Sequence, residues 1–319
     1  MAFRIGLVGL CTSHPESWVP EIRELVGKGV IDAEVTACWD SGECRRPTFA
    51  KEFAQQFQIP SPVENMLDMM DLVDGVIVHT TNWDRHLEQA RPFVEAGKTV
   101  FIDKPMAGNL RDCAQIQDWL RRGKRVFGGS VLRFCYEVRD YLAIPVEERG
   151  EITCAYSTAG VDEFNYGIHA YATVIALLGK GVASARWLSG TRQKQLCLEW
   201  PNGKTALLTV GDAKWLPFNV TACSDRKFQQ IAIDNMKVYR AMLEAVMPWF
   251  CDQTGKVPLP VPADELLEPE LAAIAARRSW QRNGERVLLG DLRMDDDGYD
   301  GYAFARGYAR ARLNADGTL

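Results

Sequence analysis

Residues 99–105 read Thr-Val-Phe-Ile-Asp-Lys-Pro, an apolar run that stops at two charged residues and a proline. We interpret this run as a β-strand, because it follows the turn-forming pair Gly97-Lys98 and Pro105 cannot donate a hydrogen bond to a continuing strand. In a parallel sheet, ligands bind at the edge formed by the carboxyl ends of the strands. The stretch therefore predicts that Lys104 lies at a ligand crevice, beside the carboxylate of Asp103. The alternative is a lysine in an exposed turn.

The first 130 residues alternate short apolar runs with amphipathic stretches. This alternation is typical of βαβ units built around a parallel sheet. Besides the strand at 99–102, we expect strands at residues 3–9, 33–39, 73–79 and 125–128. The intervening helices are expected at residues 15–26, 49–57, 65–70, 85–96 and 110–122.

After about residue 133 the pattern changes to alternating strands that are close in sequence. Strands are expected at residues 151–157, 196–200, 205–210, 218–224, 227–233 and 286–289, and helices at 166–178, 236–250 and 268–281. Asn202-Gly203 between two strands is a strong hairpin signal. The sequence therefore predicts an α/β class chain. A doubly wound parallel sheet in residues 1–130 precedes an α+β domain with an open, mainly antiparallel sheet in residues 131–290.

The last segment, residues 291–319, is acidic and aromatic at its start. We expect either a disordered end or an arm that packs on another subunit.

The bulk composition excludes several classes of function. The 319 residues carry a formal net charge of -5, so no cationic field favours nucleic acid or an anionic membrane surface. No run reaches the roughly 20 apolar residues that span a bilayer, and the N-terminus does not resemble a signal peptide. The nine cysteines include no CxxC pair, which favours a reduced chain. We expect a cytoplasmic protein that acts on a small molecule.

The first expected strand runs into a turn that resembles a dinucleotide-binding loop. In the GxGxxG register only Gly9 is a glycine, and Cys11 and His14 occupy the other two glycine positions. Thr12 and Ser13 are good helix N-caps and hydroxyl donors. Such a turn can hold a pyrophosphate with backbone N–H groups at the helix N-terminus. A turn that binds no nucleotide is the alternative.

Asp40 ends the second expected strand. An acidic residue there accepts hydrogen bonds from the ribose hydroxyls of NAD. Arg45 and Arg46 follow closely, and an arginine at this place could instead hold the 2′-phosphate of NADP. We expect NAD, with NADP possible.

The strand at 73–79 ends in polar side chains, His79, Thr80, Thr81 and Asn82, and His86 follows on the next helix. Side chains at this edge would line the crevice beside the nicotinamide. A metal site that combines His14, His79 and His86 with Cys11 is the alternative. We expect no metal, because none of these spacings matches a known ligand motif.

These segments together resemble the Gfo/Idh/MocA family of oxidoreductases, named for glucose–fructose oxidoreductase and inositol dehydrogenase. The resemblance rests on Val73-Asp74-Gly75-Val76-Ile77-Val78, on residues 96–105 with Asp103 for the commoner glutamate, and on Leu132-Arg133-Phe134. Residues 278–289 are similar to the family's closing helix and strand, so the likeness covers about residues 3 to 290. It implies a Rossmann domain, an active site between two domains, and a homo-oligomer, dimer or tetramer.

The resemblance also implies roles for two residues. The family's lysine maps onto Lys104, and its motif D-x-G-x-H-x-x-D maps onto residues 165–172, where asparagine and alanine replace both aspartates. His169 is retained and is the expected proton acceptor, because imidazole titrates near neutral pH. Asp162, Glu163 or Tyr166 could replace its missing carboxylate partner.

The function expected from these observations is hydride transfer between NAD(P) and a secondary alcohol of a sugar, polyol or related small molecule. Lys104 and His169 would handle the proton, and Asp103 would support the site or the ribose. Four side chains are candidate hydroxyl binders: Arg133, Glu163, Asn165 and Tyr166. Two alternatives stay open. One is a glycoside-cleaving enzyme with a tightly bound, recycled NAD, and the other is a non-catalytic regulator that binds a dinucleotide or sugar.

Overall fold

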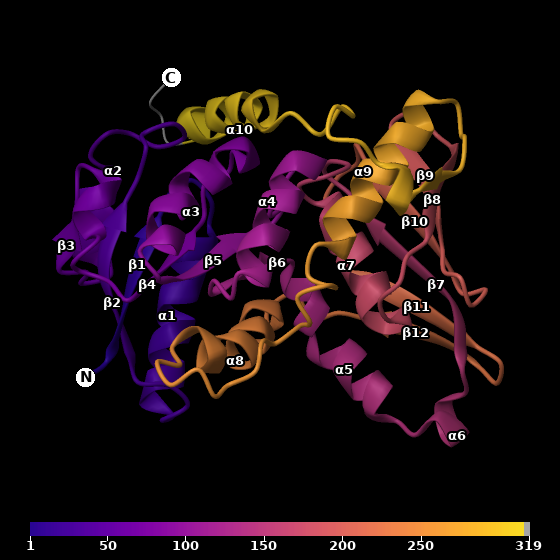
Figure 1. The fold of residues 1–319 in the computed structure, drawn as a ribbon, viewed down its shortest axis with the longest axis horizontal. Coiled ribbons are helices and arrows are strands. Elements are labelled where there is room, and N and C mark those ends of the chain that lie inside the picture. Colours follow the sequence, from indigo (N-terminus) through magenta and orange to yellow (C-terminus); the bar gives the residue numbers. More distant parts are fainter. Residues whose placement is uncertain (316–319) are drawn as a thin grey trace.

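The computed structural model describes residues 1–315 and places two sheets side by side (Figure 1). The strands of the first sheet are β1 (Phe3–Val8), β2 (Ala33–Trp39), β3 (Ser61–Pro62), β4 (Gly75–Val78), β5 (Thr99–Asp103) and β6 (Val126–Gly129). All pairs are parallel, in the order β3-β2-β1-β4-β5-β6. This confirms the doubly wound sheet. Its order reverses between β1 and β4, which is the switch point where such sheets bind ligands.

The helices that connect these strands follow the expected pattern. They are α1 (His14–Gly27), α2 (Phe49–Gln56), α3 (His86–Glu95) and α4 (Leu110–Arg121), with the short 3₁₀ helices η1 (Met66–Met69) and η2 (Trp83–Arg85). The central strands β4 and β5 and the edge strand β6 are buried at every position, as is typical of parallel strands covered on both faces. Because both faces of these strands are buried, their sequences are continuous apolar runs, which made the strands predictable.

The second sheet has seven strands. They are β7 (Ile152–Ala159), β8 (Ser184–Ser189), β9 (Gln193–Glu199), β10 (Thr205–Gly211), β11 (Asn219–Ser224), β12 (Phe228–Ala232) and β13 (Val287–Leu288). Their order is β12-β11-β7-β10-β9-β8-β13, and only β7 and β10 pair in parallel. The expected hairpin is confirmed, because β9 and β10 pair across Asn202-Gly203. The sequence analysis missed β8, whose outer half is exposed and carries no apolar alternation.

The second domain also carries helices, listed here with their bounds: η3 (Val131–Phe134), α5 (Tyr136–Ala143), α6 (Val146–Arg149), α7 (Gly167–Leu178), α8 (Val238–Phe250), α9 (Glu268–Gln281) and η4 (Leu289–Asp291). α7 and α9 pack on one face of the second sheet. α8 instead returns to the first domain and contacts α1 and β5. There the Phe3 and Phe250 rings meet edge to face, with centroids 5.5 Å apart.

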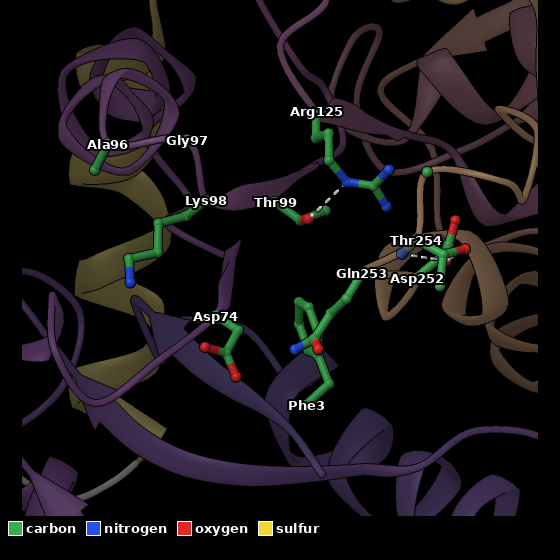
Figure 2. A pocket seen from close by; sticks show the side chains of 11 residues that line it. Phe3, Asp74, Ala96, Gly97, Lys98, Thr99, Arg125, Asp252, Gln253 and Thr254 are labelled. Carbon is green, nitrogen blue, oxygen red and sulfur yellow. Dashed lines mark hydrogen bonds between the residues drawn. The ribbon is translucent and has the colours of Figure 1, made fainter. Parts of the chain in front are cut away.

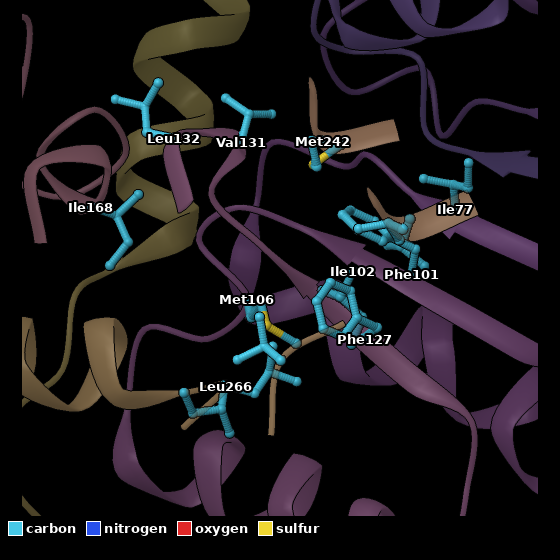
Figure 3. Close-up of a cluster of buried hydrophobic side chains, with 14 of the residues drawn as sticks. Ile77, Phe101, Ile102, Met106, Phe127, Val131, Leu132, Ile168, Met242 and Leu266 are labelled. Carbon is cyan, nitrogen blue, oxygen red and sulfur yellow. The ribbon is translucent and has the colours of Figure 1, made fainter. Parts of the chain in front are cut away.

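One hydrophobic core runs through both domains. Figure 3 shows Ile77, Phe101 and Phe127 of the first sheet, Met242 of α8 and Ile168 of α7, which all belong to this core. All five side chains are buried. The two domains therefore share a packed interface.

The C-terminal segment differs from its expectation. Residues 301–315 form helix α10 (Gly301–Ala315), which lies across the first domain of its own chain (Figure 1). The Tyr299 ring stacks on Phe164 with centroids 3.9 Å apart, and Tyr299 O accepts a hydrogen bond from Trp83 Nε1 at 2.9 Å. The Gly301 N–H donates to Asp84 Oδ2 at 2.7 Å. A disordered end is wrong for residues 301–315, because they form a helix and the preceding Tyr299 is buried within the chain. An arm that packs on another subunit stays a prediction, and residues 316–319 of this segment lie outside the described residues.

Candidate active site

A crevice lies where β1, β4 and β5 end and the second domain begins. It has a volume of about 50 Å³ and is lined by Thr12, Ser13, His14, His79, Thr80, Thr81, Asp103, Lys104, Asn165, Tyr166 and Tyr308. All but Tyr308 were named from the sequence as residues expected at this crevice. The crevice is thus at the edge that the Asp103-Lys104-Pro105 stretch predicted.

Asp103 is at the centre of the polar contacts in this crevice. Its Oδ2 lies 2.5 Å from His14 Nδ1 and 3.0 Å from His79 Nδ1, and its Oδ1 accepts a hydrogen bond from Lys104 N at 2.7 Å. Burial alone would raise the pKa of this carboxyl, but the charge and hydrogen bonds of His14 and His79 hold it well below its ordinary value. Asp103 is therefore a carboxylate, and it joins the ends of three neighbouring strands.

Lys104 points from β5 toward the second domain. Its Nζ donates to the backbone oxygen of Asn165 at 3.0 Å and to Asn165 Oδ1 at 3.1 Å, and it lies 5.1 Å from the centre of the Tyr166 ring. Burial lowers the pKa of Lys104, and the nearby carboxylates of Asp103 and Asp162 only partly oppose that effect. Asn165 occupies the position where the family motif has an aspartate. It therefore binds this amine through two uncharged oxygens.

His169 lies near this amine but is not among the residues that line the crevice. Its Nδ1 is 2.7 Å from Ser130 Oγ, and its ring packs against Phe218 with centroids 5.0 Å apart. Burial, followed by the positive charges of Lys104 and His14, lowers the pKa of His169 well below its ordinary value. The partner of His169 is thus a serine hydroxyl.

None of the three side chains considered as partners hydrogen-bonds the His169 ring, although the Tyr166 ring meets it edge-on with centroids 6.0 Å apart. Asp162 Oδ1 accepts backbone hydrogen bonds from Phe164 at 2.9 Å and Tyr166 at 3.2 Å, so this carboxylate orders the turn before α7. Glu163 forms an ion pair with Lys194 and lies 3.6 Å from Arg277. The sequence could not single out Ser130, because a serine 39 positions away carries no local signal.

Two candidate hydroxyl binders lie away from the crevice. Arg133 pairs with Glu265 at 2.6 Å and lines a separate cavity of about 290 Å³. Glu163 is held by the two cations named above. Among the four substrate candidates of the sequence analysis, Asn165 and Tyr166 are the two at the crevice.

The loop after β1 is tightly packed. Gly9 has a φ of +85°, and a Cβ at this position would lie 2.5 Å from Thr80 Oγ1, so glycine is required. Cys11 is fully buried and clusters with Cys44, and Tyr308 and Ala309 of α10 cover this pair. The helix α10 therefore closes the loop that a pyrophosphate would contact.

A larger cavity, of about 620 Å³, opens at the carboxyl end of β2. Its wall includes Asp40, Ser41, Gly42, Arg46 and Val63. Asp40 Oδ2 accepts a hydrogen bond from Leu10 N at 2.7 Å, and Oδ1 accepts one from Gly42 N at 2.8 Å. Asp40 thus holds the loop after β1 and also borders a space of the size and position suited to an adenosine.

Arg45 is placed differently from its expected role. Its side chain is buried; Nε donates to Leu10 O at 3.2 Å and a terminal nitrogen pairs with Glu16 at 2.9 Å. Arg46 is the arginine that borders the cavity, where it also pairs with Glu52. Arg45 therefore holds the loop after β1 in position through these contacts and does not face the expected nucleotide site.

Asn82 and His86 lie beneath the crevice. Asn82 Oδ1 accepts a hydrogen bond from Asp84 N at 3.2 Å and so caps η2. His86 Nε2 is 2.7 Å from Thr80 O, and burial lowers its pKa. Both residues hold the chain after β4 in position.

The sequence analysis missed two residues that shape the site. Tyr308 of α10 lines the crevice, and its only signal was the spacing of four from Phe304, typical of a helix face. Glu270 of α9 is buried, and its Oε1 accepts a hydrogen bond from Met106 N at 3.1 Å. Burial raises the pKa of Glu270 to about 7. No local pattern marks this contact, because 164 residues separate the partners.

A second cavity, of about 510 Å³, lies at the opposite edge of the first sheet. Figure 2 shows Asp74, Lys98, Thr99 and Arg125 around it. Its charged side chains already have partners, since Asp74 pairs with Arg4 at 2.7 Å and Arg125 donates to Thr99 Oγ1 at 3.0 Å. It lies at the amino ends of the strands, away from the edge where such sheets bind ligands.

Comparison with known proteins finds relatives of the first domain. Residues 3–129 match the model of an oxidoreductase family with an NAD-binding Rossmann fold, named Gfo/Idh/MocA. The first domain of this chain is therefore similar to that family. Inositol 2-dehydrogenase 1 of Saccharopolyspora erythraea is 30% identical over 135 residues, which are 42% of this chain and 38% of that protein. The matched part thus spans little more than a third of this curated relative.

Solved structures extend the likeness of fold to both domains. An oxidoreductase of Thermotoga maritima superposes with a TM-score of 0.76 at 15% identity, over 92% of this chain and all of that one. The myo-inositol dehydrogenase of Lactobacillus casei, solved with NAD(H) and myo-inositol, gives a TM-score of 0.73 at 15% identity, over 90% of this chain and 97% of that one. The two-domain architecture is therefore a known one.

We predict that Glu270→Gln stabilises the protein at alkaline pH. A carboxyl whose pKa is raised to about 7 contributes stability fully below its unfolded pKa of about 4.5, and that contribution is lost as the pH rises through 7. The shift corresponds to about 3 kcal/mol at most. Thermal unfolding at pH 5 and pH 8.5 measures the effect. An equal change in Tm at both pH values would contradict it.

We predict that removing the end of α10 exposes two thiols. A chain that stops after Ala305 keeps the Tyr299 stacking and the Gly301 hydrogen bond but loses Tyr308 and Ala309, which cover Cys11 and Cys44. Titration with a thiol reagent should find up to two more reactive cysteines than in the full chain. Cys11→Ser and Cys44→Ser in the shortened chain should each remove one. No gain in reactivity would show that α10 does not cover this loop.

Proposed function

We propose that this protein is an NAD-dependent oxidoreductase that acts on a secondary alcohol of a polyol or sugar. The observation that carries the proposal is Lys104, a lysine with a lowered pKa at the switch point of a Rossmann sheet, with its Nζ anchored by Asn165 in the facing domain. The match of residues 3–129 to an NAD-binding oxidoreductase family supports the cofactor, and the inositol dehydrogenases among the similar proteins support the class of substrate.

The residues at the two cavities fit a dinucleotide. The space beside Asp40 would take the adenosine, with a carboxylate near its ribose. At the other end, the buried hydroxyls of Thr80 and Thr81 have no hydrogen-bond partner within residues 1–315 and border the crevice. These hydroxyls would bind the nicotinamide end. The crevice of about 50 Å³ is smaller than a nicotinamide ring, so Tyr308 and α10 must shift when the cofactor binds.

The chain's own part in the chemistry is orientation and proton handling, while bound NAD supplies the acceptor for the hydride. Lys104 would hydrogen-bond the reacting hydroxyl. Because burial lowers the pKa of Lys104, a larger fraction of this amine is neutral and able to accept the hydroxyl proton. Asn165 and Tyr166 would bind neighbouring hydroxyls. We retain His169, paired with Ser130, as a second proton acceptor behind Lys104.

We also propose that the chain forms a homo-oligomer through the open face of its second sheet. Tyr156 of β7 and Leu207 of β10 are direct neighbours on this face, each about 40% exposed, and Phe228 of β12 is 69% exposed. The helices α7 and α9 cover only the opposite face. Light scattering with Phe228→Asp as the comparison variant would test the face.

A cytoplasmic location stays a prediction from the sequence; within residues 1–315, no helix combines the length and apolar character that a membrane span requires.

Thermal unfolding with NAD, NADH and NADP tests the cofactor. NAD and NADH should raise Tm, since a ligand at 100 times its Kd stabilises the folded state by about 2.7 kcal/mol. NADP should raise it less, because Asp40 would repel a 2′-phosphate. No shift with any of the three would refute the proposal.

The variant Lys104→Met tests the catalytic role. Turnover of a polyol panel with NAD should fall by about 10²-fold or more, because a positioned acid–base group typically contributes that much. NAD affinity should stay within a few-fold. Lys98→Met is a matched control, since Lys98 lies at the opposite edge of the sheet and donates to Val73 O. Near-native turnover of Lys104→Met would remove Lys104 from the mechanism.

A further inference from the structure

The strongest unassigned cluster in the described residues is that of His14, His79 and Asp103. Each comes from a different strand end: His14 follows β1, His79 follows β4, and Asp103 ends β5. Both imidazoles direct Nδ1 at the same oxygen, Asp103 Oδ2, at 2.5 and 3.0 Å. Two histidines on one buried carboxylate call for an explanation beyond packing.

A metal ion is one explanation, since two imidazoles and a carboxylate are common ligands of divalent transition metals. The distances disfavour it. A tetrahedral zinc would hold two ligand atoms about 3.3 Å apart, whereas His14 Nδ1 and Asp103 Oδ2 are 2.5 Å apart. Metal-bound imidazoles also usually donate their other N–H, and His79 Nε2 is buried without a partner within residues 1–315. Hydrogen bonds explain the geometry better.

The two imidazoles differ in their access to the crevice. The His14 side chain is 11% exposed, whereas that of His79 is fully buried. Burial lowers the pKa of His79, so its ring stays neutral and donates Nδ1–H to Asp103. His79 therefore positions the carboxylate of Asp103, and His14 is the histidine of this cluster whose side chain is partly exposed to the crevice.

The His14 ring is held firmly in its orientation. It stacks on Trp18 of α1, with centroids 5.7 Å apart and planes 8° apart, and it meets Tyr239 of α8 edge-on at 5.3 Å. The charged and titratable groups that face it are Asp103, His79, Lys104 and Tyr239, and Tyr166 and Tyr308 line the same crevice. With Nδ1–H donated to the carboxylate, Nε2 carries the free lone pair. An imidazole oriented in this way by a carboxylate is the arrangement of a general base.

We propose that His14 and Asp103 form a second acid–base pair of this active site, with His79 as its positioning residue. The pair replaces the carboxylate–imidazole partnership that His169 lacks. The proposal rests on the proposed function. When the alcohol is oxidised, its carbon loses a hydride with two electrons to NAD⁺, and its hydroxyl proton passes to the neutral amine of Lys104. His14 Nε2 then takes this proton from the ammonium of Lys104 and releases it to water, so both groups return to their starting state.

The test compares His14→Gln and Asp103→Asn with the unaltered protein, using NAD and a polyol panel that includes myo-inositol and scyllo-inositol. His14→Gln should lower kcat about 10²-fold with KM and NAD affinity within a few-fold. Added imidazole should restore part of the turnover of His14→Gly but none of that of Lys104→Met. Near-native kcat in His14→Gln, a loss confined to NAD affinity, or failure of imidazole rescue would overturn the proposal.

A second measurement needs no substrate. The chain has only four histidines, so ¹⁵N-histidine spectra can be assigned by single substitutions. The His14 ring should carry its proton on Nδ1, while His79 and His169 stay neutral as the pH is lowered. An Nε2–H tautomer of His14, or one tightly bound zinc or cobalt ion per chain that is lost in His14→Gln, would overturn the proposal.

The two measurements separate this proposal from the proposed function. If the unaltered protein turns over no polyol and binds no NAD, the proposed function fails and the proton-transfer role fails with it. The spectra then still decide whether the His14–Asp103 pair exists. If turnover is present and His14→Gln retains it, only the present proposal fails.

Discussion

The buried carboxylate of Asp103 is the contact on which the architecture of the site depends. A charge removed from water must be paired, and removing one partner of such a pair costs about 3–5 kcal/mol. Here the partners are His14, His79 and the backbone N–H of Lys104. Because these groups follow or end three neighbouring strands, one carboxylate fixes the relative positions of the loops that form the crevice.

The position of Lys104 follows from this constraint. With Asp103 held inward, the next side chain projects outward from β5 to Asn165 at the start of α7. The shared hydrophobic core keeps α7 at that distance from the first sheet, and Glu270 of α9 holds the backbone at Met106. An amine shielded from water between two domains is the result, and its lowered pKa has this burial as its cause.

Much of the fold could be predicted from the sequence, because strands covered on both faces are continuous apolar runs and α9 shows a clear helical pattern. Its bounds, Glu268–Gln281, coincide with those expected. The misses share another cause. These contacts join residues that are far apart in sequence: Ser130 hydrogen-bonds His169, and Arg45 donates a hydrogen bond to Leu10 O. Such pairs leave no periodic signal.

The sequence by itself determined the parallel sheet, the ligand edge and the presence of Lys104 there, because hydrophobic periodicity and the Pro105 stop are local properties. Only the tertiary structure decided which groups surround that lysine. It brought His14 to Asp103, placed His169 beside Ser130, and laid α10 over Cys11. The physical reason is that burial and pairing of charge depend on what packs against a group, and the packing partners come from distant parts of the chain.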